Sequence, residues 1–169
     1  MAAGVVVFAI GIGLASHFWG TGAIHLLIAP TETATVDIDG QRAPPPESRG
    51  GHQRYELARG KHQVRVTVGQ VVTDYALELN SGLDELLLPA SQGQCFVSVA
   101  VSANDTSQGS APKVLSRYAD HTPVPVAGAF YVGTEELPAR RRGGGILIEV
   151  VTCSLLGQPD AELITLLGL

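Results

Sequence analysis

The first 31 residues of the chain carry no charged side chain, and the first charged residue is Glu32. Within this stretch, residues 4–29 form an uncharged and mostly apolar run. A helix of that length measures about 39 Å, whereas the hydrocarbon core of a bilayer is about 30 Å thick. The run therefore predicts a transmembrane helix within residues 1–30, which is retained as an anchor, loosened at residues 20–22 and ended by Pro30.

A cleaved signal peptide is the alternative for the same segment. Residues 5–14 would then supply the apolar stretch, and residues 21–23 the small side chains of a cleavage site. A signal peptide normally carries basic residues before its apolar stretch, and this chain has none there. A retained anchor is therefore favoured, with His17 and His25 as interfacial hydrogen-bonding residues rather than proton carriers or metal ligands.

The rest of the chain is acidic. It holds 11 Lys or Arg residues and 16 Asp or Glu residues, which gives a net charge of −5. Phosphate binding needs a basic face, so nucleic acid is excluded as a partner. Only Lys61 and Lys113 are lysines, and with the abundant Ala, Gly and Val this Arg preference favours GC-rich coding and a bacterial source.

Residues 33–92 are expected to form a small antiparallel β-sandwich. Apolar and polar residues alternate, as in Val64, Val66 and Val68 with Arg65 between them, which is typical of half-buried strands. Short turn sequences such as Asp39-Gly40 separate the alternating segments. The predicted strands are residues 35–39, 53–57, 62–68, 71–79 and 83–88.

Three motifs in this region follow one another in a familiar order: Val36-Asp-Ile-Asp-Gly-Gln41, Tyr55-Glu-Leu-Ala-Arg-Gly-Lys-His-Gln-Val-Arg-Val66 and Leu77-Glu-Leu-Asn-Ser-Gly82. Together they resemble the PEGA domain over about residues 33–90. That family has a strand ending in Asp-Gly, a Leu-x-x-Gly-x-His-x-Val-x-Val strand pair and a closing strand. This chain departs from the family in residues 42–51, where Pro-Pro-Pro replaces the usual Gly-x-Thr-Pro turn and the eponymous tetrapeptide is absent.

The resemblance implies a fold and a role. PEGA domains are small β-sandwich modules of bacterial envelope proteins, often just outside a membrane helix or behind a kinase, and they have no established catalytic residues. A binding or spacing module of the envelope is therefore what the resemblance implies for this chain.

Residues 93–169 are expected to form a second β-rich unit. Residues 95–103 and 146–153 have strong strand patterns, and residues 113–118 a shorter one. Residues 161–167 fit either a short helix capped by Asp160 or another strand. The sequence does not decide whether this unit shares a core with the first one.

Cys95 and Cys153 can form one disulfide if the domain lies outside the cytosol. In the loop-entropy model this bond contributes roughly 4 kcal/mol. The strand pattern argues against it, because Cys95 lies on the apolar face of its strand, whereas Ile146, Ile148 and Val150 form the more apolar face opposite Cys153. A bulge can reverse that parity, so bonded and free cysteines both stay open.

The run Arg140-Arg141-Arg142-Gly143-Gly144 is the strongest candidate for an anion or lipid head-group contact, because arginine side chains and glycine-loop amides bind phosphate. A solvated loop is the favoured interpretation, since neither a P-loop lysine nor a helix pattern follows. His52, His62 and His121 have no metal-ligand spacing. No catalytic, metal or cofactor-binding residues are expected.

The sequence thus predicts a non-enzymatic, single-pass protein of the bacterial inner membrane, held by residues 4–29 with its C-terminal domain in the periplasm. Its expected partner is a protein or the cell wall, and a small-molecule substrate is not expected. Two alternatives stay open. One is a subunit of a larger membrane complex, and the other is an enzyme that uses Cys153 or His121.

Overall fold

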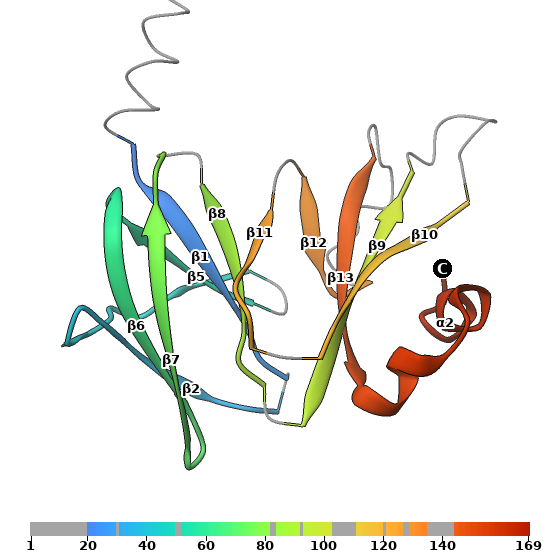
Figure 1. The fold of residues 1–169 in the computed structure, drawn as a ribbon, viewed down its shortest axis with the longest axis horizontal. Coiled ribbons are helices and arrows are strands. Elements are labelled where there is room, and N and C mark those ends of the chain that lie inside the picture. Colours follow the sequence, from blue (N-terminus) through green and yellow to red (C-terminus); the bar gives the residue numbers. More distant parts are fainter. Residues whose placement is uncertain are drawn as a thin grey trace, which may run out of the picture.

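The structure is a computed structural model that describes residues 20–29, 31–49, 52–81, 84–91, 93–102, 111–119, 121–126, 129–134 and 144–169. These residues form three small β-sheets, one short α-helix and one 3-10 helix (Figure 1). The predicted β-rich fold is confirmed.

Sheet A has five strands in the order β11-β8-β1-β5-β4, and sheets B and C have four each, in the orders β3-β2-β6-β7 and β10-β9-β13-β12. The strands of sheet A are β1 (Gly22–Leu27), β4 (Glu47–Arg49), β5 (His52–Leu57), β8 (Glu85–Pro89) and β11 (Val124–Val126). The strands of sheet B are β2 (Ala34–Ile38), β3 (Gln41–Arg42), β6 (Gly60–Val68) and β7 (Val71–Leu79). The strands of sheet C are β9 (Gln94–Val101), β10 (Lys113–Tyr118), β12 (Phe130–Val132) and β13 (Gly145–Thr152), after which come the 3-10 helix η2 (Cys153–Gly157) and α2 (Asp160–Leu166).

The sheets stack in layers, with sheet A in the middle (Figure 1). One face of sheet A packs on sheet B around residues such as Ile24, Val64 and Leu79. Its other face packs on sheet C around Leu27 and Phe96. A third apolar cluster lies between sheet C and the C-terminal helices, and Leu163 of α2 is fully buried there.

Strand β1 corrects the prediction of a helix through residues 4–29. Residues 22–27, which that helix would include, form a fully buried strand at the centre of sheet A, antiparallel to β5 and parallel to β8. Ile24 and Leu26 face sheet B, whereas Leu27 faces sheet C. The run is uncharged and mostly apolar because both faces of the strand are buried, and this pattern resembles that of a membrane segment.

The start of β1 explains a glycine that we expected to loosen a helix. A Cβ atom at Gly22 would lie 2.8 Å from the Asp84 carbonyl oxygen and 3.1 Å from Leu79 Cδ1. Only glycine allows the backbone to approach so closely. No helix in the described ranges is both long and apolar enough to cross a membrane. Residues 1–19, where the predicted anchor begins, lie outside the described residues.

Sheet A takes strands from all three predicted segments of the chain. β1 precedes residue 33, while β11 follows residue 92 and pairs with β8. The expected antiparallel pairing holds for most neighbours, but β1–β8 and β12–β13 are parallel pairs. Of the two alternatives for the C-terminus, the structure has the helix, with Pro159 as its N-cap and Asp160 as its first residue.

Candidate binding surface

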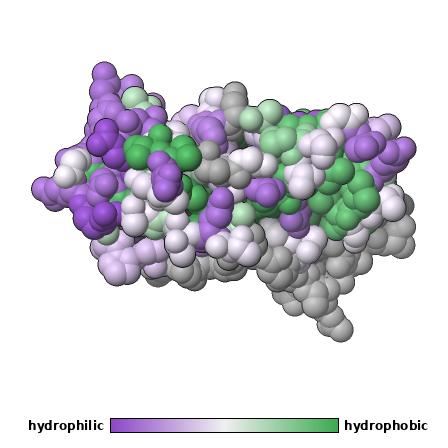
Figure 2. Space-filling view, turned by 90° about the horizontal axis from the view of Figure 1, so that it is seen from below, coloured by the Kyte–Doolittle hydropathy of each residue, from purple (hydrophilic) through white to green (hydrophobic). Residues whose placement is uncertain are grey.

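Sheet B alone among the three sheets leaves one face open to solvent in the described residues. The central strands of sheets A and C are packed on both faces. In sheet B, the alternating residues of β6 and β7 are buried on one side and mostly exposed on the other. Figure 2 shows hydrophilic surface gathered at the end of the molecule where sheet B lies, and more hydrophobic surface toward the opposite half. We call the exposed side of β2, β6 and β7 the outer face of sheet B.

A row of charged side chains crosses the outer face. Strand register places Asp37 of β2 beside Arg65 of β6, and Arg65 beside Asp74 of β7. Arg65 binds Asp74 with two parallel hydrogen bonds, from Nε to Oδ1 at 2.7 Å and from Nη2 to Oδ2 at 3.2 Å. Arg42 Nε lies 3.4 Å from Asp37 Oδ1. The row is therefore held in one geometry before any partner arrives.

These contacts also set the charges of the row. The Arg65 guanidinium lowers the pKa of Asp74, chiefly through the hydrogen bonds between them, and Asp74 in turn raises the pKa of Arg65. Both groups therefore stay ionised at neutral pH. Their side chains are about three-fifths exposed, so the pair contributes little to stability and remains accessible to a partner.

A hollow of about 390 Å³ lies over this row, lined by Asp37, Gly40, Gln63, Arg65 and Asp74. Four of the five lining residues have polar side chains and the fifth is glycine, whereas sites for small organic ligands have mostly apolar linings. The hollow offers carboxylate oxygens, an amide and a guanidinium edge. Such a lining suits the backbone and polar side chains of a macromolecular partner better than a small apolar ligand.

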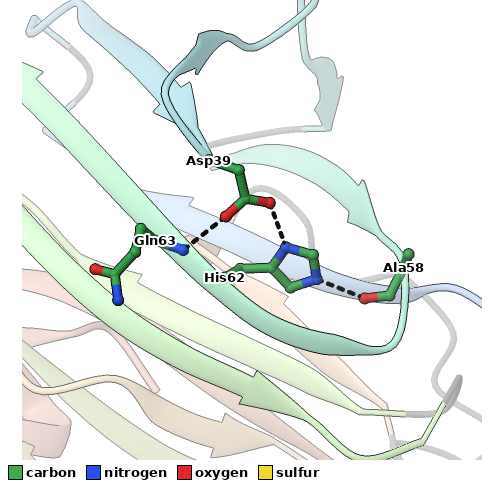
Figure 3. Close-up of polar contacts among 4 residues, drawn as sticks. All are labelled: Asp39, Ala58, His62 and Gln63. Atoms are coloured by element: carbon green, nitrogen blue, oxygen red, sulfur yellow. Dashed lines mark hydrogen bonds and ion pairs between the residues drawn. The ribbon is translucent and has the colours of Figure 1, made fainter.

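The Asp39-Gly40 turn borders this surface at Gly40, and Asp39 binds His62 of β6 (Figure 3). Asp39 has φ +52° and Gly40 has φ +79°, and the two residues connect paired Ile38 and Gln41. Two positive φ angles define the tight hairpin turn for which Asp-Gly is a preferred sequence. The predicted strand over residues 35–39 therefore ends one residue earlier, at Ile38, because the chain turns at Asp39.

Asp39 binds across to β6. Its Oδ1 accepts the backbone N–H of Gln63 at 2.9 Å, and its Oδ2 lies 2.8 Å from His62 Nδ1. The other ring nitrogen of His62, Nε2, lies 2.7 Å from the Ala58 carbonyl oxygen (Figure 3). A carbonyl only accepts hydrogen bonds, and so does an ionised carboxylate. Both ring nitrogens can donate only in the protonated ring, so the arrangement favours the imidazolium form of His62, which joins the turn to Ala58.

The pKa values of both groups reflect this arrangement. The backbone N–H of Gln63, and then the hydrogen bond from His62, lower the pKa of Asp39. Burial acts to lower the pKa of His62, but its hydrogen bonds to Asp39 and Ala58 together outweigh burial and raise it. The motif residues Asp39 and His62 are thus direct partners, although 23 positions separate them.

Replacing Asp39 with asparagine is expected to lower the pKa of His62 toward its ordinary value. Asparagine tolerates the positive φ of this turn and still accepts the Gln63 N–H, so the substitution mainly removes the charge. The measurement is the NMR titration of the His62 ring in the wild type and in Asp39→Asn. An unchanged pKa would contradict the assigned contact.

The same pair predicts how stability varies with pH. The His62 pKa is raised on folding, so its contribution is complete below about pH 6.5 and is lost as pH rises through the folded-state pKa. The Asp39 pKa is lowered, so its contribution is complete above about pH 4 and is lost as pH falls through the folded-state value. Both contributions are complete between about pH 4 and pH 6.5. Urea denaturation should therefore show the largest loss of unfolding free energy in Asp39→Asn within this range.

Cys95 and Cys153 form a disulfide in the structure, with Cα atoms 4.9 Å apart. The parity argument against this bond is wrong. Leu147 and Val151, on the same side of β13 as Cys153, pack in the same cluster as Cys95, while Ile148 on the opposite side packs against sheet A. Both faces of β13 pack against apolar clusters, so the pattern of apolar residues does not show which face carries the bonded cysteine. Neither cysteine is a free thiol, as the enzyme alternative would require of Cys153.

The other candidates from the sequence are residues 140–144 and His121. Arg140, Arg141, Arg142 and Gly143 lie outside the described residues, and only Gly144 of that run is placed, directly before β13. His121 Nδ1 lies 2.8 Å from the Pro89 carbonyl oxygen.

Sequence reasoning missed a polar cluster between sheets A and C. His25 of β1 and His52 of β5 are both buried, and their ring centroids lie 5.1 Å apart. The Phe130 ring meets the His25 ring edge-on at 4.7 Å, and Glu85 Oε1 is 3.9 Å from His25 Nε2. His25 is therefore a residue of a sheet interface, not of a membrane boundary. A sequence signal was available, because Ile24 and Leu26 flank His25 with the spacing of a strand.

The described residues contain no group of three or more His, Cys, Asp or Glu side chains that can hold a metal ion. No known protein family, curated protein or solved structure matches the chain. The layered fold and the polar outer face of sheet B are thus what a functional proposal rests on.

Proposed function

We propose that this chain is a non-catalytic binding protein of the bacterial envelope, tethered to the inner membrane by its first 19 residues. It uses the outer face of sheet B to bind a protein or cell-wall partner. The observation that carries the proposal is that face itself, a regular sheet surface left open, while the central strands of both other sheets are packed on both sides in the described residues. Its charged row is exposed and prearranged, which reduces the entropy lost on binding.

Two features support export. Disulfides persist outside the cytosol, and Cys95 is bonded to Cys153. Residues 1–19 carry no charged side chain, and β1 begins three residues later. Residues 1–19 would measure about 28 Å as a helix, close to the hydrocarbon core of about 30 Å, with Trp19 at the interface. Cleavage after Ala23 would remove the start of β1, which is a further reason to favour a retained tether.

The PEGA-like character of residues 33–90 is part of the proposal. Its support is local, because the Asp-Gly motif and the Gly-x-His motif form one contact through Asp39 and His62 (Figure 3). A structural reason for the two motifs to occur together is therefore present in this chain. Such a module needs no catalytic residues in order to position or bind a partner.

Membrane attachment is tested by fractionation of bacterial cells that produce the full chain. We expect the protein in the membrane fraction, released by detergent but not by carbonate, and cut by protease added to spheroplasts. A variant without residues 2–19 should lose membrane attachment. Full-length protein that carbonate releases, or that is cut only after the inner membrane is broken, would contradict the tether or its orientation.

The binding face is tested in the same cells with a photo-crosslinking amino acid at Gln63, which lines the hollow, and at Leu115, which is exposed on β10 of sheet C. We expect a discrete adduct from position 63 and none of the same mass from position 115. Equal adducts from both positions, or adducts from position 115 alone, would place the binding surface elsewhere.

A further inference from the structure

The edge of sheet B formed by β7 differs from the other strand edges in the described residues. β7 is nine residues long, contains neither proline nor glycine, and keeps an unbroken register with β6. The edge strands β3, β4, β11 and β12 have only two or three residues each, and β11 contains Pro125. β10 is longer but has a register shift between Val114 and Ser116. Short strands, prolines and register shifts usually protect exposed sheet edges from pairing with another strand, and β7 has none of these features.

The turn before β7 fixes which backbone groups face the open edge. β6 and β7 are joined by the two residues Gly69 and Gln70, with Val68 paired to Val71. The pair that closes a two-residue hairpin is hydrogen-bonded, and hydrogen-bonded pairs then alternate along the ladder. Odd-numbered residues of β7 therefore bond to β6. The N–H and C=O groups of Val72, Asp74, Ala76 and Glu78 point to the open side.

The contacts of β6 support this assignment. If even-numbered residues of β6 bond to β7, its odd-numbered residues must bond toward β2. Gln63 does so, because its N–H donates to Asp39 Oδ1 and its carbonyl accepts the Asp39 N–H at 2.8 Å. The open edge of β7 thus presents four donors and four acceptors in strand geometry.

Sheet A, which lies under sheet B, shows how much space is open beside the β7 edge. Tyr75 of β7 donates a hydrogen bond to the Pro89 carbonyl at the end of β8, so β7 lies over β8. Sheet A continues one strand further, to β11, where Pro125 pairs with Leu86. Leu86 packs on the core between sheets A and B, yet Pro125 on the same face is exposed. A place for one more strand of sheet B is therefore open above β11.

That place suits a single strand better than a second copy of the chain. A second copy that paired through its own β7 would bring its own sheet A into the layer that β11 already occupies.

The residues around the open edge indicate which side chains the added strand should carry. Asp74 and Glu78 are exposed on the outer side, whereas Leu86 and Pro125 lie below. Opposite charges stabilise cross-strand pairs, so basic residues are favoured outward and apolar residues inward.

We propose that β7 binds an extended segment of a partner protein as an added strand, with basic side chains alternating outward and apolar side chains inward. This inference deepens the proposed binding function, since the added strand would lie beside the charged row and continue the outer face of sheet B. Main-chain hydrogen bonds would provide affinity, and the alternating side chains would provide specificity.

The probe is a nine-residue peptide of alternating valine and lysine, blocked at both ends and labelled, added to the full chain in an uncharged detergent with empty micelles as background. Three control peptides have proline at the centre, glutamate in place of lysine, or the same composition with all lysines grouped. We expect the alternating basic peptide to bind at least tenfold more tightly than each control.

The matched protein variants are Ala76→Pro and Ala76→Ser. The Ala76 N–H faces the open edge, so proline removes a donor to the partner without removing a bond of the sheet. We expect Ala76→Pro to weaken binding at least tenfold with unchanged circular dichroism, and Ala76→Ser to bind like the wild type. If Ala76→Pro alters the fold, the test uses the wild-type chain and a version of the alternating peptide with N-methylated backbone amides. These amides can no longer donate hydrogen bonds to β7, so this peptide should bind at least tenfold more weakly.

Three results would overturn the inference: equal binding of the grouped-lysine peptide, unchanged binding by a folded Ala76→Pro variant, or a dimer of the chain that Ala76→Pro dissociates. The last result would show that a second copy occupies the edge. If the peptide test fails while position 63 still gives its adduct, the binding function stands and its partner lies on the outer face away from β7.

Discussion

Replacing Leu26 with alanine is expected to lower the free energy of unfolding by about 2–5 kcal/mol, the usual cost of truncating a fully buried leucine. Leu26 is 1% exposed and packs between sheets A and B from the central strand of sheet A. Its strand neighbours on both sides prevent the backbone from collapsing into the space left behind. The measurement is urea denaturation of the full chain in mild detergent.

Leu14→Ala is the matched control, because it is the same chemical change within the same uncharged stretch. We expect it to leave the unfolding midpoint of the β-sheets unchanged, since the proposed tether ends before the folded part begins. Equal effects of the two substitutions, or none from Leu26→Ala, would contradict the assignment of residues 22–27 to the core.

Removing the disulfide is the second large effect. Replacing both Cys95 and Cys153 with alanine is expected to cost about 4 kcal/mol, the loop-entropy value for a separation of 58 residues. The bond joins the start of β9 to the end of β13, where the chain turns into the helices that cover sheet C. Without it, the covering layer around Leu163 should open more readily than sheets A and B.

Dithiothreitol provides the matched experiment on the unmodified chain. Reduction should lower the unfolding midpoint of the wild type to that of the double variant, and should leave the double variant unchanged. Alkylation in intact cells before lysis adds the biological readout, because an exported chain should resist labelling until it is reduced. Immediate labelling of both cysteines in cells would contradict export.

Strands β2, β6 and β7 of sheet B were predictable from the sequence because each has one buried and one more exposed face. Val64, Val66 and Val68 alternate with polar residues, and Asp39-Gly40 marks a tight turn. Both signals are local. They depend on the period of the strand and on the backbone of two residues, neither of which requires knowledge of the rest of the fold.

Strand β1 was not predictable in the same way, because sheets B and C bury both of its faces. Such a strand has no polar side to reveal its period, and its uncharged sequence continues that of residues 1–19. The prediction that Cys153 lies on the less buried face of its strand was wrong for the same reason. Its strand also lies between two apolar layers, so neither face is the obvious interior.

The candidate binding surface was only partly visible in the sequence. Asp37, Asp39, Arg65 and His62 all lie in motifs or strands that were identified from the sequence, but nothing in the sequence pairs them. Their pairing depends on strand register, which brings Asp37 beside Arg65 and Asp39 beside His62 across gaps of more than 20 residues. The open edge of β7 depends on strand order, since the same nine residues would be protected in the middle of a sheet.

The central claim is that the folded domain begins at β1 and that only the residues before it tether the chain. Hydrogen exchange of the full chain in mild detergent, followed by mass spectrometry over a urea series, tests it most directly. We predict that the amides of residues 22–27 exchange with the same urea dependence as those of β5 and β8, their partners in sheet A. If the amides of residues 22–27 instead exchange like those of residues 1–19, at a rate that urea does not change, the account is contradicted.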